Sequence, residues 1–243
     1  MALPTGPLEI AVGDTFSSNA NQQHPLGTYA ETSDGRGWRY CQAGAVDLVA
    51  GNWIQASAQI ANHLAMTPSA AAIGVRAVTV TPGATAGAAN LYAEGFAIVS
   101  TTPDIGSCYQ VKDHLAITAS VAFVVNIKEP AGLAVAWTSS TRVDLQANPY
   151  KNVIQTPVTT LTGSCVGVAQ AIITATQFGW LLVHGPGACL IAGTPSVGLA
   201  VVVPGTAAGA CVVDGAASAT PVVGTMMTTG VDGKCNAVFV TLL

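Results

Sequence analysis

The sequence predicts a mainly β fold of two β-barrel or β-sandwich units, with an extended N-terminal arm and at most one short helix. Short apolar runs alternate with Gly, Pro, Thr and Ser, which is the usual pattern of strands joined by tight turns. The pattern is clearest from Gln177 to Asp214, where no apolar run is long enough for a buried helix. We therefore expect this stretch to organise the rest of the chain.

Charged residues are scarce along the chain. Only 8% of the 243 residues are charged, although half are hydrophobic, whereas about 25% are charged in a typical soluble domain. Residues 152–213 contain no Asp, Glu, Lys or Arg. Because a surface with so little charge is poorly suited to stand alone in water, we expect much of it to lie against other subunits. We expect a homo-oligomer, and a trimer as its form.

The composition disfavours several partners. No apolar segment approaches the roughly 18 residues of a membrane-spanning helix. The first seven residues lack the basic start and apolar core of a secretion signal, and aromatic residues are few, which argues against an outer-membrane barrel. A net charge of −4 with eight scattered basic residues argues against nucleic acid. We expect neither a membrane nor a nucleic acid as a partner.

The six cysteines do not form a metal-binding motif. No two are close enough for a CxxC clip, and the last four are separated by 24, 22 and 24 residues, so they could lie on neighbouring strands. We interpret them as small buried hydrophobic residues, with disulfides as the minor alternative. They are Cys41, Cys108, Cys165, Cys189, Cys211 and Cys235.

Three segments are expected in chain order. Residues 1–34 contain three prolines and a polar tract, so they should form an extended arm that orders on a neighbour. Residues 35–150 and 151–243 should form the first and second β domains. The turn or linker Asn148 to Asn152 is the candidate boundary between them.

The two β domains show a faint internal repeat. Trp38 precedes Ala50-Gly51 by the same number of residues that separate Trp180 from Ala192-Gly193. We interpret this match as two copies of one ancestral β unit, with the two tryptophans at related places. The alternative is coincidence, because Ala, Gly and Val are abundant in this sequence.

Most elements after the arm are expected to be strands. Alternation of apolar and polar residues, or a short apolar run closed by a turn, marks each of them. The segment Asn52 to Met66 is the exception, because its apolar residues fit one face of a short helix better than a strand, although two β segments remain open. Strands are expected at residues 38–42, 77–81, 92–100, 108–112, 116–126, 141–145, 180–183, 189–192, 199–203, 210–213, 222–227 and 237–243.

One candidate for catalysis is Cys165. The segment Gly163 to Gly167 has the spacing of a nucleophile elbow with cysteine in the serine position. An elbow needs a strand before the nucleophile and a helix after it, whereas residues 168–176 are rich in Thr and β-branched residues. A packed strand cysteine is therefore the favoured interpretation.

A second candidate is the group Cys108, Asp113 and His114, which could form a thiol–imidazole pair with an orienting carboxylate. Residues so close along a strand point to alternating faces, so a solvated turn is favoured. The four histidines (His24, His63, His114 and His184) lack partners at ligand spacing, and the Pro82-Gly83 and Pro204-Gly205 segments lack the Lys-Ser/Thr of a phosphate loop. We assign no catalytic, cofactor-binding or metal-binding residue.

Several short motifs carry a family resemblance. They are His24 to Thr28, Gly37 to Tyr40, Ala89 to Gly95, Asn148 to Tyr150, Phe178 to Pro186 and Pro221 to Gly224. Through these motifs, the chain from about His24 to its C-terminus resembles a family of small structural proteins of tailed bacteriophages, which are encoded with the head genes and taken to be decoration or cement proteins.

The resemblance implies a non-enzymatic virion protein that binds the outside of a capsid and stabilises the shell. Its partners would be the major capsid protein and further copies of itself, as trimers, without a cofactor. It would be located on the capsid surface after assembly in the host cytoplasm. Two alternatives stay open: a β-rich receptor- or glycan-binding module of a phage fibre, which should display clustered aromatic residues, and a cysteine hydrolase.

Overall fold

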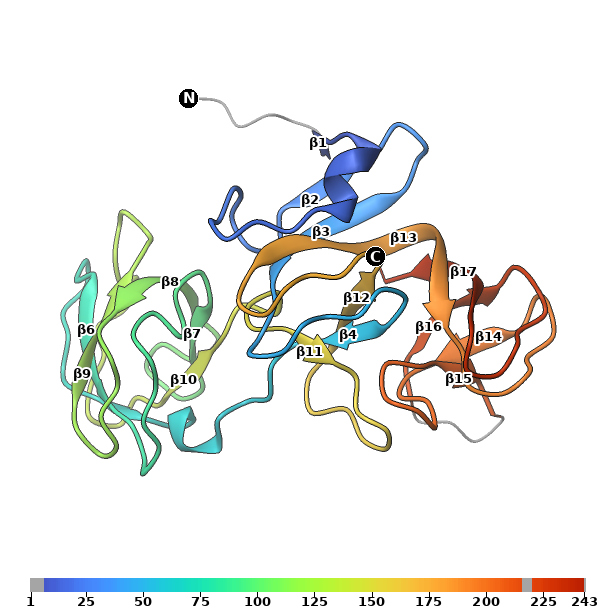
Figure 1. The fold of residues 1–243 in the computed structure, drawn as a ribbon. Helices are drawn as coiled ribbons and strands as arrows, with labels where there is room; N and C mark the ends of the chain where they lie inside the picture. Colours follow the sequence, from blue (N-terminus) through green and yellow to red (C-terminus); the bar gives the residue numbers. More distant parts are fainter. Residues whose placement is uncertain (1–6, 216–219, 243) are drawn as a thin grey trace. The chain divides into compact units, whose positions relative to one another are not determined.

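The computed structural model describes residues 7–215 and 220–242, and these residues form two compact units (Figure 1). The discontinuous unit combines the described parts of Met1–Ala58 and Pro149–Leu243, and the inserted unit is Gln59–Asn148. The expected mainly β class is confirmed, because seventeen strands and two short 3-10 helices are the elements of the described residues. Neither helix of the described chain has the length or apolar character needed to span a bilayer.

One sheet holds the discontinuous unit together. Its main path runs in the order β1-β2-β3-β13-β17-β16-β14-β15, and β4, β11 and β12 attach beside β13. A 3-10 helix, η1 (Val12–Phe16), follows β1. The strands are β1 (Leu8–Glu9), β2 (Tyr29–Glu31), β3 (Gly37–Gln42), β4 (Trp53–Gln55), β11 (Ile154–Gln155), β12 (Cys165–Ala169), β13 (Phe178–Leu190), β14 (Ala200–Val202), β15 (Val212–Val213), β16 (Val222–Met226) and β17 (Cys235–Thr241).

Strand β13 is the central element of this sheet. Its 13 residues join two runs that the sequence predicted as separate strands. The first part pairs with β3 and the second part with β17, both antiparallel. Gly185, at the change of partner, has φ of +98°, a conformation that glycine adopts at little cost. The stretch expected to organise the chain therefore supplies the strand at the centre of the sheet.

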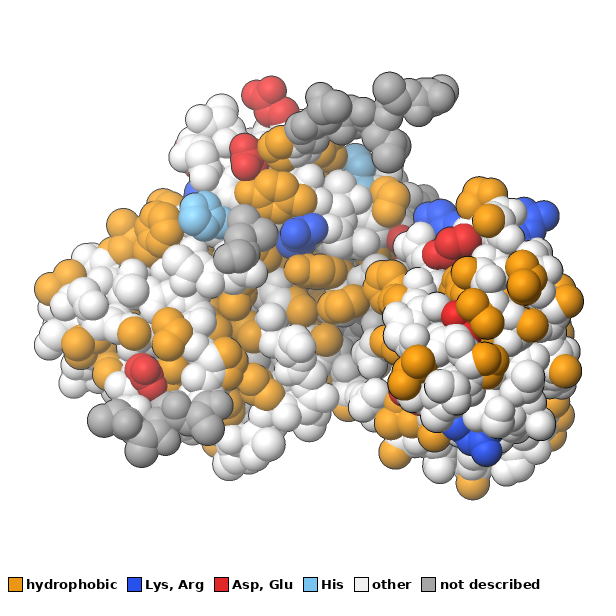
Figure 2. All heavy atoms as spheres, turned by 180° about the vertical axis from the view of Figure 1, so that it is seen from behind, with side chains coloured by type: hydrophobic (Ala, Val, Ile, Leu, Met, Phe, Trp, Pro, Cys, Tyr) orange, Lys and Arg blue, Asp and Glu red, His pale blue; other side chains and the backbone are white. Residues whose placement is uncertain are grey.

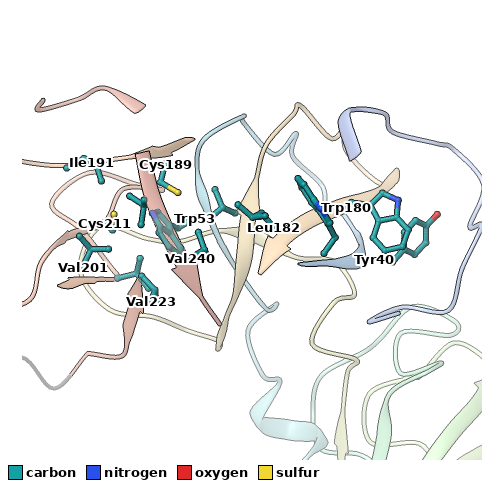
Figure 3. Packing of buried hydrophobic residues seen from close by; sticks show 14 of the residues in the cluster. Tyr40, Trp53, Trp180, Leu182, Cys189, Ile191, Val201, Cys211, Val223 and Val240 are labelled. Carbon is teal, nitrogen blue, oxygen red and sulfur yellow. The ribbon is translucent and has the colours of Figure 1, made fainter. Parts of the chain in front are cut away.

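The main apolar core lies around β13 and the strands beside it. Trp38, Trp53, Leu182 and Val240 are fully buried there, and Figure 3 shows side chains of this cluster converging from β4, β13, β16 and β17. A second cluster in the same unit gathers around Leu48, Ile54, Ile173 and Leu181.

The inserted unit has a sheet and a core of its own. The sheet order is β10-β7-β8-β9-β6-β5, and all its ladders are antiparallel. The core contains Tyr92, Val111, Val125 and Trp137. The elements are η2 (Ala61–His63), β5 (Thr67–Pro68), β6 (Ala77–Thr81), β7 (Phe96–Val99), β8 (Cys108–His114), β9 (Phe123–Ile127) and β10 (Val143–Gln146).

The division of the chain differs from the expected domains 35–150 and 151–243. One crossing between the units does lie at Asn148 and Pro149, but the other lies at Ala58 and Gln59. Residues 35–58 belong with the C-terminal half because β3 pairs with β13 and β4 pairs with β11 and β12. Sequence spacing could not reveal these long-range ladders.

The expected placement of Trp38 and Trp180 in two separate β units is wrong. Both lie in the discontinuous unit, on neighbouring antiparallel strands of one sheet, where Trp38 pairs with Leu182 and Trp180 with Tyr40.

The helix favoured for residues 52–66 is also absent. Residues 53–55 form β4, and only Ala61–His63 adopt a helical turn. All three residues of β4, Trp-Ile-Gln, are buried, so burial on both faces removes the alternation that marks a half-buried strand.

The N-terminal segment is not the free arm that we expected from residues 1–34. Residues 1–6 lie outside the described part of the chain, but β1 pairs with β2, and β2 pairs with β3. Asn19 also forms a β-bridge with Phe178. The segment therefore orders on its own chain, without needing a neighbour.

The last four cysteines lie on neighbouring strands or bridges, as their spacing suggested. Cys165 is in β12, Cys189 is in β13, Cys235 is in β17 opposite Leu190, and Cys211 bridges to Ile191. All six cysteines of the chain are free thiols in this structure.

Candidate functional site

An aromatic cluster lies where the N-terminal segment crosses β3 and β13. Tyr40 and Trp180 are direct partners in the ladder, with ring centroids 5.0 Å apart. The imidazole of His24 lies 5.3 Å from the Tyr40 ring and 5.4 Å from the Trp180 ring. The Tyr40 hydroxyl accepts a hydrogen bond from the backbone N–H of Gln23 at 2.9 Å, which fixes the segment over the rings.

This cluster lines part of a small hollow of about 340 Å³. The rest of the lining comes from the N-terminal segment and is mostly polar. Tyr40 and Trp180 are only 1% and 5% exposed, so their faces are occupied by protein and are not free to stack on a ligand. The lining residues are Ile10, Asp14, Ser17, Asn19, Gln23, His24, Tyr40 and Trp180.

A second hollow, of about 540 Å³, lies on the outer face of the sheet in the inserted unit. Its lining is basic: Arg76 precedes β6, Lys112 lies in β8, and Lys128 follows β9. Asn126, Ala77 and Ile127 complete the lining. Such a site can attract carboxylates or other anions by charge, but it contains no group arranged for bond cleavage.

Cys165 is not placed to act as a nucleophile. It begins β12, which continues as a strand instead of turning into a helix, and it packs against the main apolar core. Burial raises the pKa of the Cys165 thiol to about 12. Because the thiolate is the reactive form, this thiol is unreactive near neutral pH.

The structure does not bring Cys108, Asp113 and His114 together as a catalytic group. Cys108 is exposed at the start of β8, whereas His114 is buried at its end. The His114 Nε2 accepts a hydrogen bond from the Tyr92 N–H, and the Asp113 carboxylate accepts one from Asn126. Burial, and then the nearby Glu129, raises the pKa of the Cys108 thiol.

The remaining predicted candidates occupy structural positions. The two ring nitrogens of His63 form hydrogen bonds with the Tyr92 hydroxyl and the Thr85 carbonyl. The His184 ring packs edge-on against Phe239. Pro82-Gly83 and Pro204-Gly205 lie in loops that follow strands. Among residues 7–215 and 220–242, no three His, Cys, Asp or Glu side chains lie together as metal ligands do.

The sequence analysis predicted neither hollow. The aromatic cluster joins residues about 140 positions apart, and only the β3–β13 ladder reveals it. The basic hollow joins three cations that look scattered in sequence. No protein-family model, curated protein or solved structure matches the chain.

Proposed function

We propose that the protein is a non-enzymatic virion structural protein that binds the outside of a tailed-phage capsid as a homo-oligomer and stabilises the shell. The sequence resemblance supports this function. The observation that carries it structurally is an outer surface rich in apolar side chains and poor in charge. Leu115 is 81% exposed, Val46 is 73% exposed, and Ile73 is 68% exposed.

These exposed residues are distributed over both units and are not confined to one pocket. A ligand pocket would concentrate them in a single concave site, whereas a protein that contacts several subunits needs apolar contacts over a broad surface. Modest contacts to several shell subunits add up through multivalency. Other large apolar side chains that are at least 45% exposed are Phe16, Val49, Ile105, Val121, Val124, Val158, Ile172, Val197, Val222, Met227 and Val231.

The test is binding to undecorated heads of the phage that supplies the gene. The full-length protein should sediment with heads, saturate at a fixed copy number, and raise the resistance of the heads to heat or chelator. Lys234, an exposed lysine in the other unit from the basic hollow, offers a site for a fluorescent label. Absence of saturable binding would overturn the proposal.

A glycan-binding module is the second candidate, and the aromatic hollow is the observation that favours it. The polar groups of Asp14, Asn19 and Gln23 could meet a sugar, but the ring faces beneath them are buried. Saturation-transfer NMR with the host's surface polysaccharide separates the two functions. Under our proposal the polysaccharide does not bind in the hollow. Its saturation-transfer signal should therefore be unchanged by Asp14→Ala.

The cysteine hydrolase has less support than either. The raised pKa values of Cys165 and Cys108 disfavour both thiolates. Any hydrolase activity of the preparation should survive Cys165→Ser and Cys108→Ser.

A further inference from the structure

The basic hollow of the inserted unit gathers three of the eight Lys and Arg residues of the chain, namely Arg76, Lys112 and Lys128. In a protein with so few charges, this concentration creates a local positive field. Figure 2 shows blue side chains near one end of the inserted unit, separated by other side chains that include a red one.

Strand alternation places Lys112 on this face. Tyr109 and Val111 are buried and Lys112 is exposed, as a regular strand predicts. A β-bulge begins here, because Val111 pairs with Ile127 and Asp113 pairs with Asn126. The bulge changes the direction of the later side chains, so that His114 is buried three residues after Val111.

The positive charges of the hollow are only partly compensated. Asp113 lies 3.5 Å from the Lys112 ammonium in an exposed pair, and Glu129 accepts a hydrogen bond from the Gln110 N–H. Neither carboxylate lines the hollow. Arg76 and Lys128 form no ion pair with any described residue.

Two exposed acidic side chains lie side by side on the first sheet edge of the discontinuous unit. Glu9 and Glu31 are direct partners in the parallel β1–β2 ladder, and both are exposed. Like charges directly opposite on adjacent strands repel each other. The Tyr29 hydroxyl donates a hydrogen bond to Glu31, and Arg36, just before β3, is paired with Asp34 instead. We call Glu9 and Glu31 the acidic edge.

Exposed apolar side chains accompany both charged surfaces. Leu8 is in β1 beside the acidic edge, and Phe16 ends η1. On the inserted unit, Val124 lies on the outer face of β9, two residues from Asn126, and Ile73 lies three residues before Arg76. Apolar contacts bordered by complementary charges are the usual composition of a protein interface.

We propose that the acidic edge of one copy binds the basic hollow of a second copy. The contact joins two different surfaces, so it is heterologous, and repetition of such a contact builds a ring when the rotation closes. A cyclic trimer needs one contact of this kind per subunit. The inference rests on the self-association in the proposed function and identifies the surfaces that produce it.

A second copy fits the hollow better than a nucleic acid. The chain carries a net charge of −4, which opposes approach to a polyanion, and three phosphate contacts give only weak, salt-sensitive binding. An acidic strand edge, in contrast, supplies two adjacent carboxylates beside the strand that ends the sheet of the described residues.

Charge reversal on the full-length protein tests the contact. The variants are Lys112→Glu with Lys128→Glu, Glu9→Lys with Glu31→Lys, and the combination of all four. All four residues are exposed, so the fold should survive, which circular dichroism checks. Mass photometry and analytical ultracentrifugation, each at low and at high salt, measure the association.

Each double variant should weaken association by roughly tenfold or more, because like charges then meet at the contact. The fourfold variant restores opposite charges and should recover the wild-type stoichiometry. High salt should weaken the wild type, because the screening length falls well below about 10 Å. The matched control Lys234→Glu, on an exposed loop, should change nothing.

Three outcomes would overturn the inference: a wild-type monomer in low salt at all concentrations, association that survives both double variants, or DNA binding that Lys112→Glu with Lys128→Glu abolishes. The second outcome would leave the acidic edge with only a protective role against strand pairing. Head binding is measured separately with the same proteins. If both double variants still self-associate while the wild type binds heads, this inference alone fails, whereas a wild type that does not bind heads refutes the proposed function.

Discussion

The inserted unit buries two histidines and one carboxyl group, His63, His114 and Asp104, whereas the buried residues classed as polar in the described discontinuous unit carry neutral amides and hydroxyls. The inserted unit is also the smaller one. A small unit buries a smaller fraction of its apolar surface, so it depends more on hydrogen bonds that specify one packing. The larger unit can rely on apolar contacts around β13.

Buried thiols show the opposite distribution. The discontinuous unit contains the buried Cys41, Cys189 and Cys211, whereas the single cysteine of the inserted unit is the exposed Cys108. The two units should therefore be destabilised by different changes. The inserted unit should lose stability when its buried hydrogen bonds are removed, and the discontinuous unit when its buried thiols ionise.

High pH should produce the largest difference between the units. Burial raises the pKa of the Cys211 thiol to about 12 and raises the pKa of Cys41 and Cys189 as well. Because the folded-state pKa exceeds the ordinary thiol value of 9.0, stability from these thiols is complete below pH 9 and is lost as pH rises toward 12. The inserted unit should stay folded to a higher pH. Its buried Tyr92 has an ordinary pKa of 10.0, above that of a thiol, and burial raises the pKa of Tyr92 further.

Limited proteolysis with an alkali-active protease, followed by mass spectrometry of the fragments, checks this order. Fragments from residues 149–215 should appear before fragments from residues 59–148 as pH rises above the ordinary range of thiol ionisation. In a Cys211→Ala variant, fragments from residues 149–215 should first appear at a higher pH than in the wild type. Earlier cleavage of the inserted unit would contradict the comparison.

Asp104→Ala should be the most damaging single substitution in the inserted unit. One carboxylate oxygen accepts hydrogen bonds from the Tyr109 hydroxyl at 2.9 Å and the Trp137 indole N–H at 2.8 Å. The other oxygen accepts a hydrogen bond from Ser107. Removing the carboxylate leaves buried donors without acceptors, which costs about 3 kcal/mol or more.

Hydrogen exchange of the full chain locates that effect. Protection should fall in peptides from residues 59–148 and stay unchanged in β13. The control Asp113→Ala removes a partly exposed carboxylate from the same unit and should cost less than about 1 kcal/mol. An equal loss of protection in both units would show that they unfold together, and the contrast between them would not hold.

The sequence predicted some parts of both units well. Strand β6 was expected at residues 77–81, where alternation is strict, and the structure has it at Ala77–Thr81. Residues 53–55 were assigned to a helix because a strand buried on both faces shows no alternation. Local pattern therefore identifies half-buried strands, and full burial hides them.

The candidate sites were less predictable than the strands. The Tyr40–Trp180 pair depends on a ladder between distant strands, and no local signal marks its register. The basic hollow depends on the β6–β9 and β8–β9 ladders, which bring Arg76, Lys112 and Lys128 together. The arguments against Cys165 and against the group around His114 needed only local sequence: the β-branched residues after Cys165, and strand alternation around His114.

Tyr40→Phe should loosen the N-terminal segment of the discontinuous unit without unfolding the unit. The substitution removes the hydroxyl that accepts the Gln23 N–H and keeps the ring packing. We expect a cost of about 1 kcal/mol, seen as faster hydrogen exchange at residues 17–24. The matched control Tyr29→Phe removes an exposed hydrogen bond to Glu31 and should have a smaller effect. Unchanged exchange in both variants would show that the bond does not hold the segment.

Thiol labelling should give the smallest effect and the finest test of the contrast between buried and exposed cysteines. In the native protein, Cys108 and Cys235 are the exposed thiols, so a maleimide probe at neutral pH should modify these two and reach all six only after unfolding. Burial raises the pKa of both, in Cys108 with a further contribution from Glu129, so labelling should be slower than that of free cysteine and should accelerate as pH rises. Cys108→Ser and Cys235→Ser should each change stability by less than about 0.5 kcal/mol, as surface substitutions do. Native labelling of Cys165 at a rate comparable to Cys108 would mean that the β12 thiol is accessible, and burial would then no longer argue against a cysteine nucleophile.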